Sequence, residues 1–194
     1  MVVSGGGLPC GNSSPVDLFK CGVKNVLLIQ IKRGLAVLLL MLLFSSHVVA
    51  APVDLPMPQQ NDTCPVCGMF VAKYPSWVAT VQYQDGHLHH FDGAKDLFKY
   101  LRNMPRWAPG HRAEDIKTIG VTEYYTLSRI EMQSAYFVIG SDVLGPMGHE
   151  LIPLESEADA QEFLQDHKGV RILRHNEVTL ELLENLDKGQ FVSQ

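Results

Sequence analysis

A short apolar segment near the start of the chain divides it into two very different parts. Residues 35–44 form an unbroken apolar run of ten residues, preceded by Lys32 and Arg33 and followed by a stretch that ends at Ala50. This order of positive residues, a short apolar run and a small residue before the cut is typical of a secretory signal. A membrane span needs about 20 apolar residues, so the run is short for an anchor. We therefore predict export with cleavage between Ala50 and Ala51, and an uncleaved membrane anchor is the alternative.

The region after Ala50 is large enough for one compact domain and is strongly acidic. It has 144 residues, with 12 lysines and arginines against 20 aspartates and glutamates, a formal charge of −8. A chain of this length can bury a single core. Its acidic surface repels phosphate backbones, which argues against nucleic acid as a partner. Residues 1–50, an upstream extension and the signal, contribute nothing to the predicted fold.

The first half of the exported region predicts a flexible arm, a hairpin and a helix. Residues 51–63 are rich in proline and glutamine without periodicity, which is typical of a flexible arm. Alternation over residues 77–83, an Asp-Gly turn at 85–86 and residues 87–91 predict a β-hairpin. Asp92 then resembles an N-cap before a helix with apolar residues at helical spacing. These apolar positions are Ala94, Leu97, Phe98 and Leu101.

The second half repeats this order. Ser156 and Asp159 form a capping-box pattern before a helix that Gly169 ends. The other predicted elements are strands at 116–125, 136–139, 149–154 and 169–173, a turn at Gly145-Pro146 and a closing helix at 178–186.

The repeated order predicts an α+β fold of two similar ββαβ units behind the cleaved signal. We place the units at about 64–108 and 114–190, within one domain over residues 64–194. Each unit alone is too small to bury an adequate core, so the two should pack together. A chance match of two common supersecondary motifs is the alternative.

Three sulfur-containing residues, Cys64, Cys67 and Met69, lie within six positions. Thiolates and thioethers are soft ligands that select copper(I) over hard cations such as Mg²⁺. Gly68 relaxes the backbone between two of the donors, so both side chains can turn toward one point. The cysteine spacing is also compatible with a redox-active pair or a structural disulfide, and Met69 alone would fill a core. We predict that Cys67 and Met69 bind copper(I), with Cys64 as an additional candidate.

A second candidate cluster, Met147-Gly148-His149, follows the Gly145-Pro146 turn. A loop broken by glycine and proline has little reason to bury a methionine. If the two units face each other, Met147 would complete a three-coordinate sulfur site, and His149 is a further donor candidate. The other interpretation is a partly exposed loop methionine.

The histidines between residues 87 and 90 give a weaker metal signal. Strand alternation places His87 and His89 on one face and His90 on the other. Structural zinc needs four donors in a closed tetrahedron, and a second Cys/His pair at the expected spacing is missing. A zinc module is therefore an alternative, and His87 with His89 is a solvated strand face or a secondary metal-acquisition patch. His111 has no partner pattern and is expected on the surface.

Enzyme motifs are missing from the sequence. It has no Gly-rich phosphate loop, nucleophile elbow or HExxH motif. Asp85, Asp92 and Asp96 are interpreted as a turn residue, a helix cap and a helix surface residue. We predict a binding protein that is not an enzyme, with a thiol oxidoreductase that uses Cys64 and Cys67 as the alternative.

Three segments together resemble the NosL family, accessory proteins of nitrous oxide reductase assembly. They are Cys64-Pro-Val-Cys67-Gly-Met69, the Asp-Gly-Ala-Lys-Asp-Leu-Phe segment at 92–98 and the Ser-Asp-Val-Leu-Gly-Pro-Met-Gly segment at 141–148. The resemblance implies a periplasmic copper(I) chaperone of two ββαβ units. Its implied partner is nitrous oxide reductase, for assembly of the copper-sulfide centre, or the ABC-transporter complex that matures this centre.

The resemblance also implies a set of ligands. Family members hold copper through a Cys-x-Met element, which matches Cys67 and Met69, and through a second-unit methionine, which matches Met147. Many relatives are lipoproteins, whereas no lipid-attachment cysteine follows the apolar run of this chain. Membrane association is therefore an alternative to a free periplasmic protein.

Overall fold

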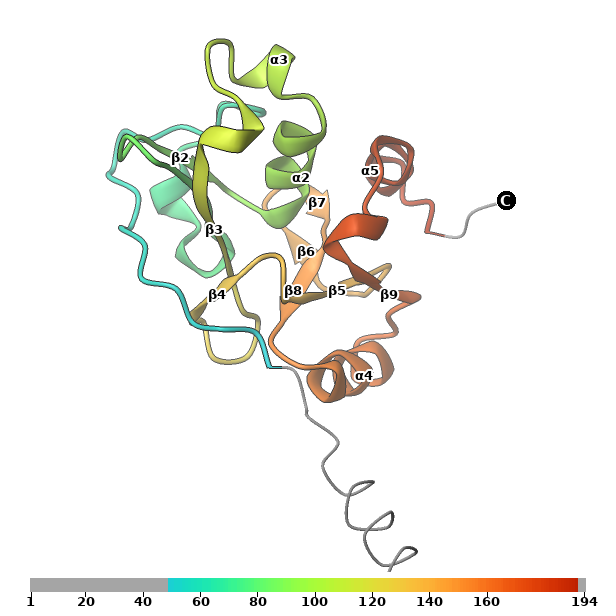
Figure 1. Ribbon diagram of the computed structural model, residues 1–194. Coiled ribbons are helices and arrows are strands. Elements are labelled where there is room, and N and C mark those ends of the chain that lie inside the picture. Colours follow the sequence, from blue (N-terminus) through green and yellow to red (C-terminus); the bar gives the residue numbers. More distant parts are fainter. Residues whose placement is uncertain (1–48, 192–194) are drawn as a thin grey trace, which may run out of the picture. The chain divides into compact units, whose positions relative to one another are not determined.

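The computed structural model describes residues 49–191, and Figure 1 shows how its elements are arranged. The predicted signal segment lies outside these residues, and cleavage between Ala50 and Ala51 stays a prediction. Across residues 49–191, no helix combines the length and apolar character needed to cross a membrane. The α+β fold class is confirmed, because antiparallel sheets and separate helices alternate along this part of the chain.

The first sheet has four antiparallel strands in the order β2-β1-β3-β4. Its strands are β1 (Ala79–Tyr83), β2 (Leu88–Phe91), β3 (Ile116–Thr122) and β4 (Arg129–Glu131). Helix α2 (Ala94–Arg102) follows β2, and the short helix α3 (Met104–Trp107) comes next. The predicted hairpin is confirmed, since β1 and β2 pair in register around a turn in which Gly86 has a φ of 89°.

The second sheet has three antiparallel strands in the order β8-β5-β9. They are β5 (Tyr136–Ile139), β8 (Ile152–Leu154) and β9 (Arg171–Arg174), and helix α4 (Glu157–Asp166) packs against them (Figure 1). A small hairpin of β6 (Leu144–Gly145) and β7 (Gly148–His149) lies between β5 and β8 in the chain. Helix α5 (Leu180–Asp187) ends the described fold.

The two units share one topology. In each unit the first strand is central, the second strand pairs on one side and the strand after the helix pairs on the other. The strand at residues 116–122, placed in the second unit by the sequence analysis, is in fact β3 of the first sheet, where it pairs with β1. Periodicity identifies a strand but carries no information about its partner, which explains the misplacement.

One apolar core joins both units. Phe98 on α2 packs edge-to-face on Phe137 of β5, with 5.1 Å between the ring centroids. The same buried cluster includes Val81 of the first sheet and Leu173 and Leu183 of the second half. The prediction that the units pack together is thereby confirmed. Helix α2 lies at this junction, which places its first turn beside both units.

The start of the described chain is more ordered than the predicted flexible arm. Pro52 bridges to Ile130 of β4, and backbone hydrogen bonds of 2.9 Å flank this bridge on both sides. Leu55 is buried and lies over Gly120 of β3. The proline-rich composition correctly excludes a helix, but an extended segment can still pair with a sheet edge, which local composition does not reveal.

Candidate metal centre

The segment from Cys64 to Met69 is a closed loop. The Cys64 amide donates a 2.9 Å hydrogen bond to the Met69 carbonyl, and the Gly68 amide donates a 2.8 Å bond to the Cys64 carbonyl. Gly68 has a φ of 77°, which glycine adopts far more readily than other residues, and no described atom lies within 4 Å of a Cβ built there. The backbone turn, and not crowding, therefore requires this glycine.

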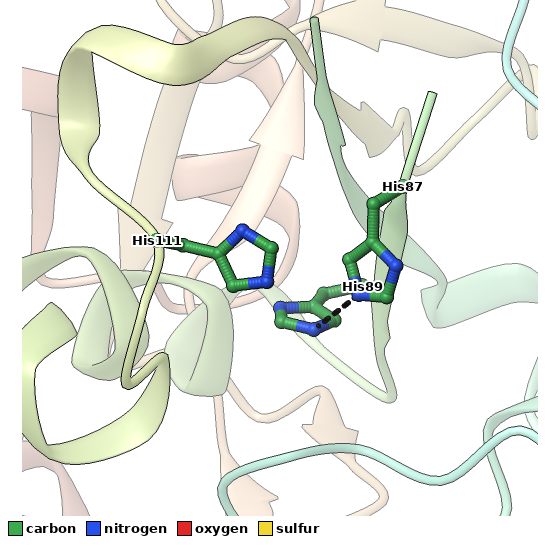
Figure 2. A group of neighbouring side chains, drawn as sticks. All are labelled: His87, His89 and His111. Carbon is green, nitrogen blue, oxygen red and sulfur yellow. Dashed lines mark hydrogen bonds between the residues drawn. The ribbon is translucent and has the colours of Figure 1, made fainter. Parts of the chain in front are cut away.

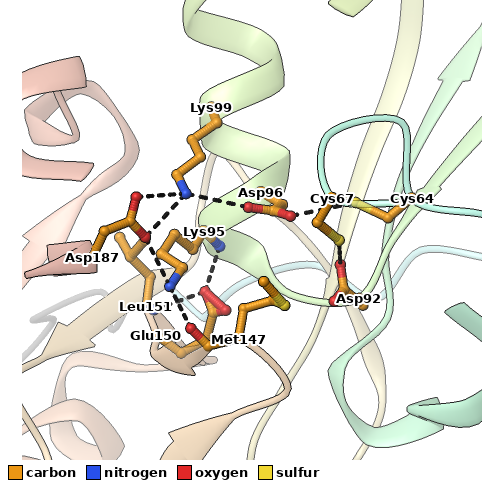
Figure 3. Close-up of polar contacts among 10 residues, drawn as sticks. All are labelled: Cys64, Cys67, Asp92, Lys95, Asp96, Lys99, Met147, Glu150, Leu151 and Asp187. Atoms are coloured by element: carbon orange, nitrogen blue, oxygen red, sulfur yellow. Dashed lines mark hydrogen bonds and ion pairs between the residues drawn. The ribbon is translucent and has the colours of Figure 1, made fainter. Parts of the chain in front are cut away.

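Both thiols of the loop face carboxylates from the first unit (Figure 3). The Cys67 thiol donates to Asp92 Oδ1 at 3.1 Å, and the Cys64 thiol donates to Asp96 Oδ2 at 3.5 Å. The donor atoms of these four residues all lie within 4.8 Å of one another. Cys64 is buried and Cys67 is half-buried, so the cluster opens to solvent on the Cys67 side. Neither thiol is in a disulfide, and the four groups together form a compact candidate metal centre.

The roles expected for the two aspartates were wrong. Asp92 does not cap α2, because Gly93 is the N-cap residue and gives no side-chain cap bond, and Asp92 is buried beside Cys67. Asp96 is also buried and is not a solvated helix residue. The sequence did hold a signal, since carboxylates four residues apart at a helix start share a face. Only the fold shows that the cysteine loop covers this face.

Burial and the neighbouring carboxylates keep both thiols protonated. Burial is the main cause that raises the pKa of Cys67 to about 12; the backbone amide of Met69 lowers this pKa, and the hydrogen bonds to Asp92 and Asp96 raise it. The pKa of Cys64 is raised still more by deeper burial. In the protein without metal, each thiol is therefore a neutral hydrogen-bond donor. A metal that binds here has to displace these protons.

One carboxylate oxygen of the centre has no hydrogen-bond partner in the described part of the chain. Asp92 Oδ1 accepts from Cys67, whereas Asp92 Oδ2 is buried and unpaired. A buried carboxylate oxygen that lacks a partner is costly unless a cation or water satisfies it. The geometry thus leaves an electron-rich position next to Cys67, where a cation would be stabilised.

The second unit reaches the same helix through the β6–β7 hairpin and the residues after it. The buried Lys95 of α2 donates from its ammonium group to the Met147 carbonyl at 2.9 Å, and its backbone amide donates to Glu150 Oε1 at 2.6 Å. A Cβ at Gly93 would lie 2.2 Å from Glu150 Oε2, so only glycine allows this close approach. These contacts hold the Met147 loop against the start of α2, which carries Asp96 and directly follows Asp92.

The remaining predicted ligands occupy different positions. Met147 is 46% exposed, and Figure 3 shows its side chain on the side of Glu150 that faces Cys67 and Asp92. Met69 is half-buried in the cysteine loop. His149 packs on Phe191 with 4.8 Å between the ring centroids, and its Nδ1 is buried without a partner among the described residues. The ligand roles of Met69, Met147 and His149 stay predictions.

Comparison with known proteins decides the family. The NosL family model matches residues 56–183, which include both cysteines, both aspartates and Met147. The chain belongs to the NosL family. This match covers the whole of the candidate centre and nearly all of the two ββαβ units.

The chain is also similar to two individual members of the family. The copper-binding lipoprotein NosL of Stutzerimonas stutzeri is 27% identical over 136 residues, which cover 64% of this chain and 65% of that relative. The present chain thus spans slightly less than two thirds of that relative. The crystal structure of the copper chaperone NosL from Shewanella denitrificans matches with a TM-score of 0.55 and 21% identity, over 68% of this chain and 99% of that chain. The second match supports the fold.

Proposed function

We propose that this NosL-family chain is an exported copper(I) chaperone. The observation that carries the proposal is the meeting of the Cys64–Met69 loop with the Met147 loop at the first turn of α2. The sulfur donors of the first loop, joined by Met147, form a soft ligand set, and soft ligands select copper(I). The names of the two relatives, a copper-binding lipoprotein and a copper chaperone, support the same metal.

The exposure of the ligands suits a carrier better than a permanent metal site. Cys67 is half-buried and Met147 is 46% exposed, so an incoming ligand from a client can reach the metal. Copper(I) bound by two or three sulfur atoms keeps an open side, through which a client ligand enters before one chaperone ligand leaves. A closed cage of four ligands would hold the ion instead of transferring it.

The aspartates have a defined part in this proposal. Each accepts a hydrogen bond from one thiol, so each is placed to take the proton that the thiol loses when copper binds. Their negative charge also attracts the cation into a partly buried position. Asp92 and Asp96 would then promote loading without being the preferred ligands of a soft ion.

The proposed location is the periplasm, and the proposed partner is nitrous oxide reductase or the transporter complex that matures its copper-sulfide centre. The signal-like segment supports export, and the family's role in nitrous oxide reductase assembly supports the partner. In this proposal the chain binds and transfers copper and catalyses no reaction of its own.

Zinc is a second candidate, because the four grouped donors include two carboxylates. Two thiolates and two carboxylate oxygens are acceptable ligands for Zn²⁺, whereas copper(I) prefers the sulfur atoms alone. The redox alternative has less support. Reactive cysteines of redox pairs have lowered pKa values, and the pKa values of Cys64 and Cys67 are both raised.

The test is metal binding by the full chain under anaerobic conditions. We expect one copper(I) per chain in competition with a chromogenic copper(I) chelator, with little zinc retained after dialysis against a zinc chelator. Tightly held zinc and no copper(I) binding would support the zinc alternative. Turnover in an insulin-reduction assay would support the redox alternative, and either result would contradict the chaperone proposal.

A further inference from the structure

A second cluster of metal-binding side chains lies at the hairpin end of the first sheet (Figure 2). His87 precedes β2, His89 lies within β2 and His111 lies in the loop after α3. One ring nitrogen from each of the three lies within 4.8 Å of the other two. Sequence analysis paired only His87 with His89, because the third histidine is more than 20 residues away and is brought in by the fold.

An aromatic residue supports the cluster. The ring of the buried Tyr83 lies under His111 with 4.3 Å between centroids, and it is 5.8 Å from His89 and 6.2 Å from His87. His87 and His111 are stacked with an interplanar angle of 16°. Strand β1 supplies Tyr83 and pairs with β2, which carries His89, and the Tyr83 amide donates a 2.9 Å hydrogen bond to the His87 carbonyl. One strand pair therefore positions Tyr83, His89 and the backbone of His87.

The orientation of His89 is set by a hydrogen bond to a buried tyrosine. His89 Nδ1 is hydrogen-bonded to the hydroxyl group of Tyr100, which is in turn hydrogen-bonded to Tyr83. The other nitrogen, Nε2, points at the cluster and lies 2.9 Å from His87 Nε2. Metal-binding histidines commonly use one nitrogen for the metal and the other for such an orienting hydrogen bond.

The spacing of the nitrogens fits a metal ion. Two imidazole nitrogens bound to one tetrahedral zinc, at bond lengths of about 2.0–2.1 Å, are separated by about 3.3 Å. The distance of 2.9 Å between His87 and His89 needs only a small outward rotation of the exposed His87 ring. His111 can then supply the third nitrogen, which leaves one coordination position open to solvent.

The local charges allow a cation to bind. Asp85 accepts a 2.9 Å hydrogen bond from the His87 amide, so a carboxylate lies next to the cluster. The only nearby basic side chain on the His111 loop, among the described residues, is Arg112, which is ion-paired with Glu114 at 3.1 Å and Asp115 at 3.5 Å. Its positive charge is therefore largely compensated.

We propose that His87, His89 and His111 form a second metal site that binds a divalent ion of borderline softness, Cu²⁺ or Zn²⁺. Three imidazoles without sulfur suit these divalent ions, whereas the thiol centre suits copper(I). The general order of stability of divalent metal complexes predicts tighter binding of Cu²⁺ than of Zn²⁺. The two sites are separate, because no histidine belongs to the group formed by the cysteines and aspartates.

The test uses the full chain with all four cysteines, Cys10, Cys21, Cys64 and Cys67, changed to serine, so that no thiol can be oxidised by Cu²⁺. Electron paramagnetic resonance with Cu²⁺ alone should give a spectrum with nitrogen hyperfine coupling from several imidazoles. His111→Gln should weaken Cu²⁺ binding by more than about 100-fold. Tyr100→Phe, which removes the orienting bond to His89 together with the bond to Tyr83, should weaken it by about 10-fold. Competition between Zn²⁺ and Cu²⁺ for the same protein then shows which of the two ions binds more tightly.

A matched histidine variant controls for unspecific binding. His167 is partly buried and is hydrogen-bonded to Asp142 at 3.3 Å, far from the cluster in sequence. His167→Gln should leave Cu²⁺ affinity unchanged, and thermal unfolding should show that each variant is folded. If His111→Gln and His87→Gln bind Cu²⁺ and Zn²⁺ as tightly as the parent, or if His167→Gln loses as much affinity as they do, the proposed site is wrong.

Discussion

The first turns of α2 and α4 are equivalent in the two ββαβ units, but their free backbone amides are hydrogen-bonded in different ways. Helix α4 is capped by its own sequence: Ser156 accepts from the Asp159 amide at 3.1 Å and donates to the Asp159 carboxylate at 2.6 Å. Helix α2 has Gly93 as its N-cap residue, which gives no side-chain cap, and the free amide of Lys95 is satisfied by Glu150 from the other unit.

The difference shows that a residue next to a helix start can serve a binding site when a distant residue satisfies the helix amides. Because Glu150 satisfies the Lys95 amide, Asp92 is free to turn toward Cys67. The first unit thus lacks a local side-chain cap on α2 and instead has the Asp92 carboxylate at the candidate centre. The second unit keeps its local cap and carries no comparable group of donors in the part of the chain that the structure describes.

The largest expected effect is on copper(I) binding at the start of α2, which the thiols of Cys64 and Cys67 face. Cys67→Ser should lower copper(I) affinity by more than about 100-fold, because a hydroxyl is a poor copper(I) ligand. This loss exceeds the one typical of residues that only hydrogen-bond to a metal ligand. Cys64→Ser should cost less, since Cys64 lies outside the Cys-x-Met element. Chelator competition under anaerobic conditions measures both. Equal losses would indicate a site with two equivalent thiolates.

The contrast between the two caps predicts unequal costs when each is removed. Glu150→Ala should lower the free energy of unfolding by about 2 kcal/mol, because the Lys95 amide becomes an unsatisfied buried donor and packing against Gly93 is lost. Ser156→Ala, the matched control on α4, should cost about 1 kcal/mol. Urea unfolding of the metal-free protein measures both. A larger loss for Ser156→Ala would show that α2 does not depend on the second unit.

Glu150 also predicts a pH dependence of stability at the start of α2. Burial raises the pKa of Glu150 to about 8 from its ordinary value of 4.5, against the opposing charge of Lys95. The folded protein therefore holds a proton that the unfolded chain releases, so this contribution is present below about pH 4.5 and is lost as the pH rises toward 8. The slope approaches about 1.4 kcal/mol per pH unit.

Glu150→Gln isolates this contribution from those of the histidines. The amide has a similar shape and does not titrate, so the stability of the variant should fall less than that of the parent between about pH 5 and 8. Urea unfolding at several pH values gives the difference between the two proteins. Parallel curves would mean that Glu150 is ionised in the folded protein.

The smallest expected effect on affinity is at the loop that Lys95 holds. Met147→Ala should weaken copper(I) binding by about 10-fold, as for removal of one weak thioether ligand. The 46% exposure of this side chain predicts a change in unfolding free energy below about 0.5 kcal/mol. A large drop in melting temperature with unchanged copper affinity would instead make Met147 a packing residue.

The same contrast explains what the sequence could reveal. The Ser156–Asp159 cap and the hairpin turn at 85–86 were predicted correctly, because each depends on residues at most a few positions apart. The partner of β3 and the orientation of Asp92 depend on contacts between segments 25 or more residues apart. Asp92 satisfied a strong local rule for a cap, and a competing long-range contact with Cys67 overrode it.

The candidate centre was predicted in part for the same reason. The clustering of Cys64 and Cys67 was visible in the spacing, and their proximity is confirmed by the structure. The carboxylates of Asp92 and Asp96 were assigned to other roles, because nothing local indicates which loop covers α2. His111 was likewise missed, since its neighbours come from a different part of the first unit.

The extended segment around Pro52 has a consequence for solubility. Strand β4 is the last strand of its sheet, and an uncovered edge strand offers free backbone groups to other copies of the chain. Pro52 and its neighbours occupy this edge, and proline has no amide with which to extend the pairing outward. Cleavage after Ala50 would leave this cover intact. Trimming as far as Leu55 would expose the edge and should promote aggregation.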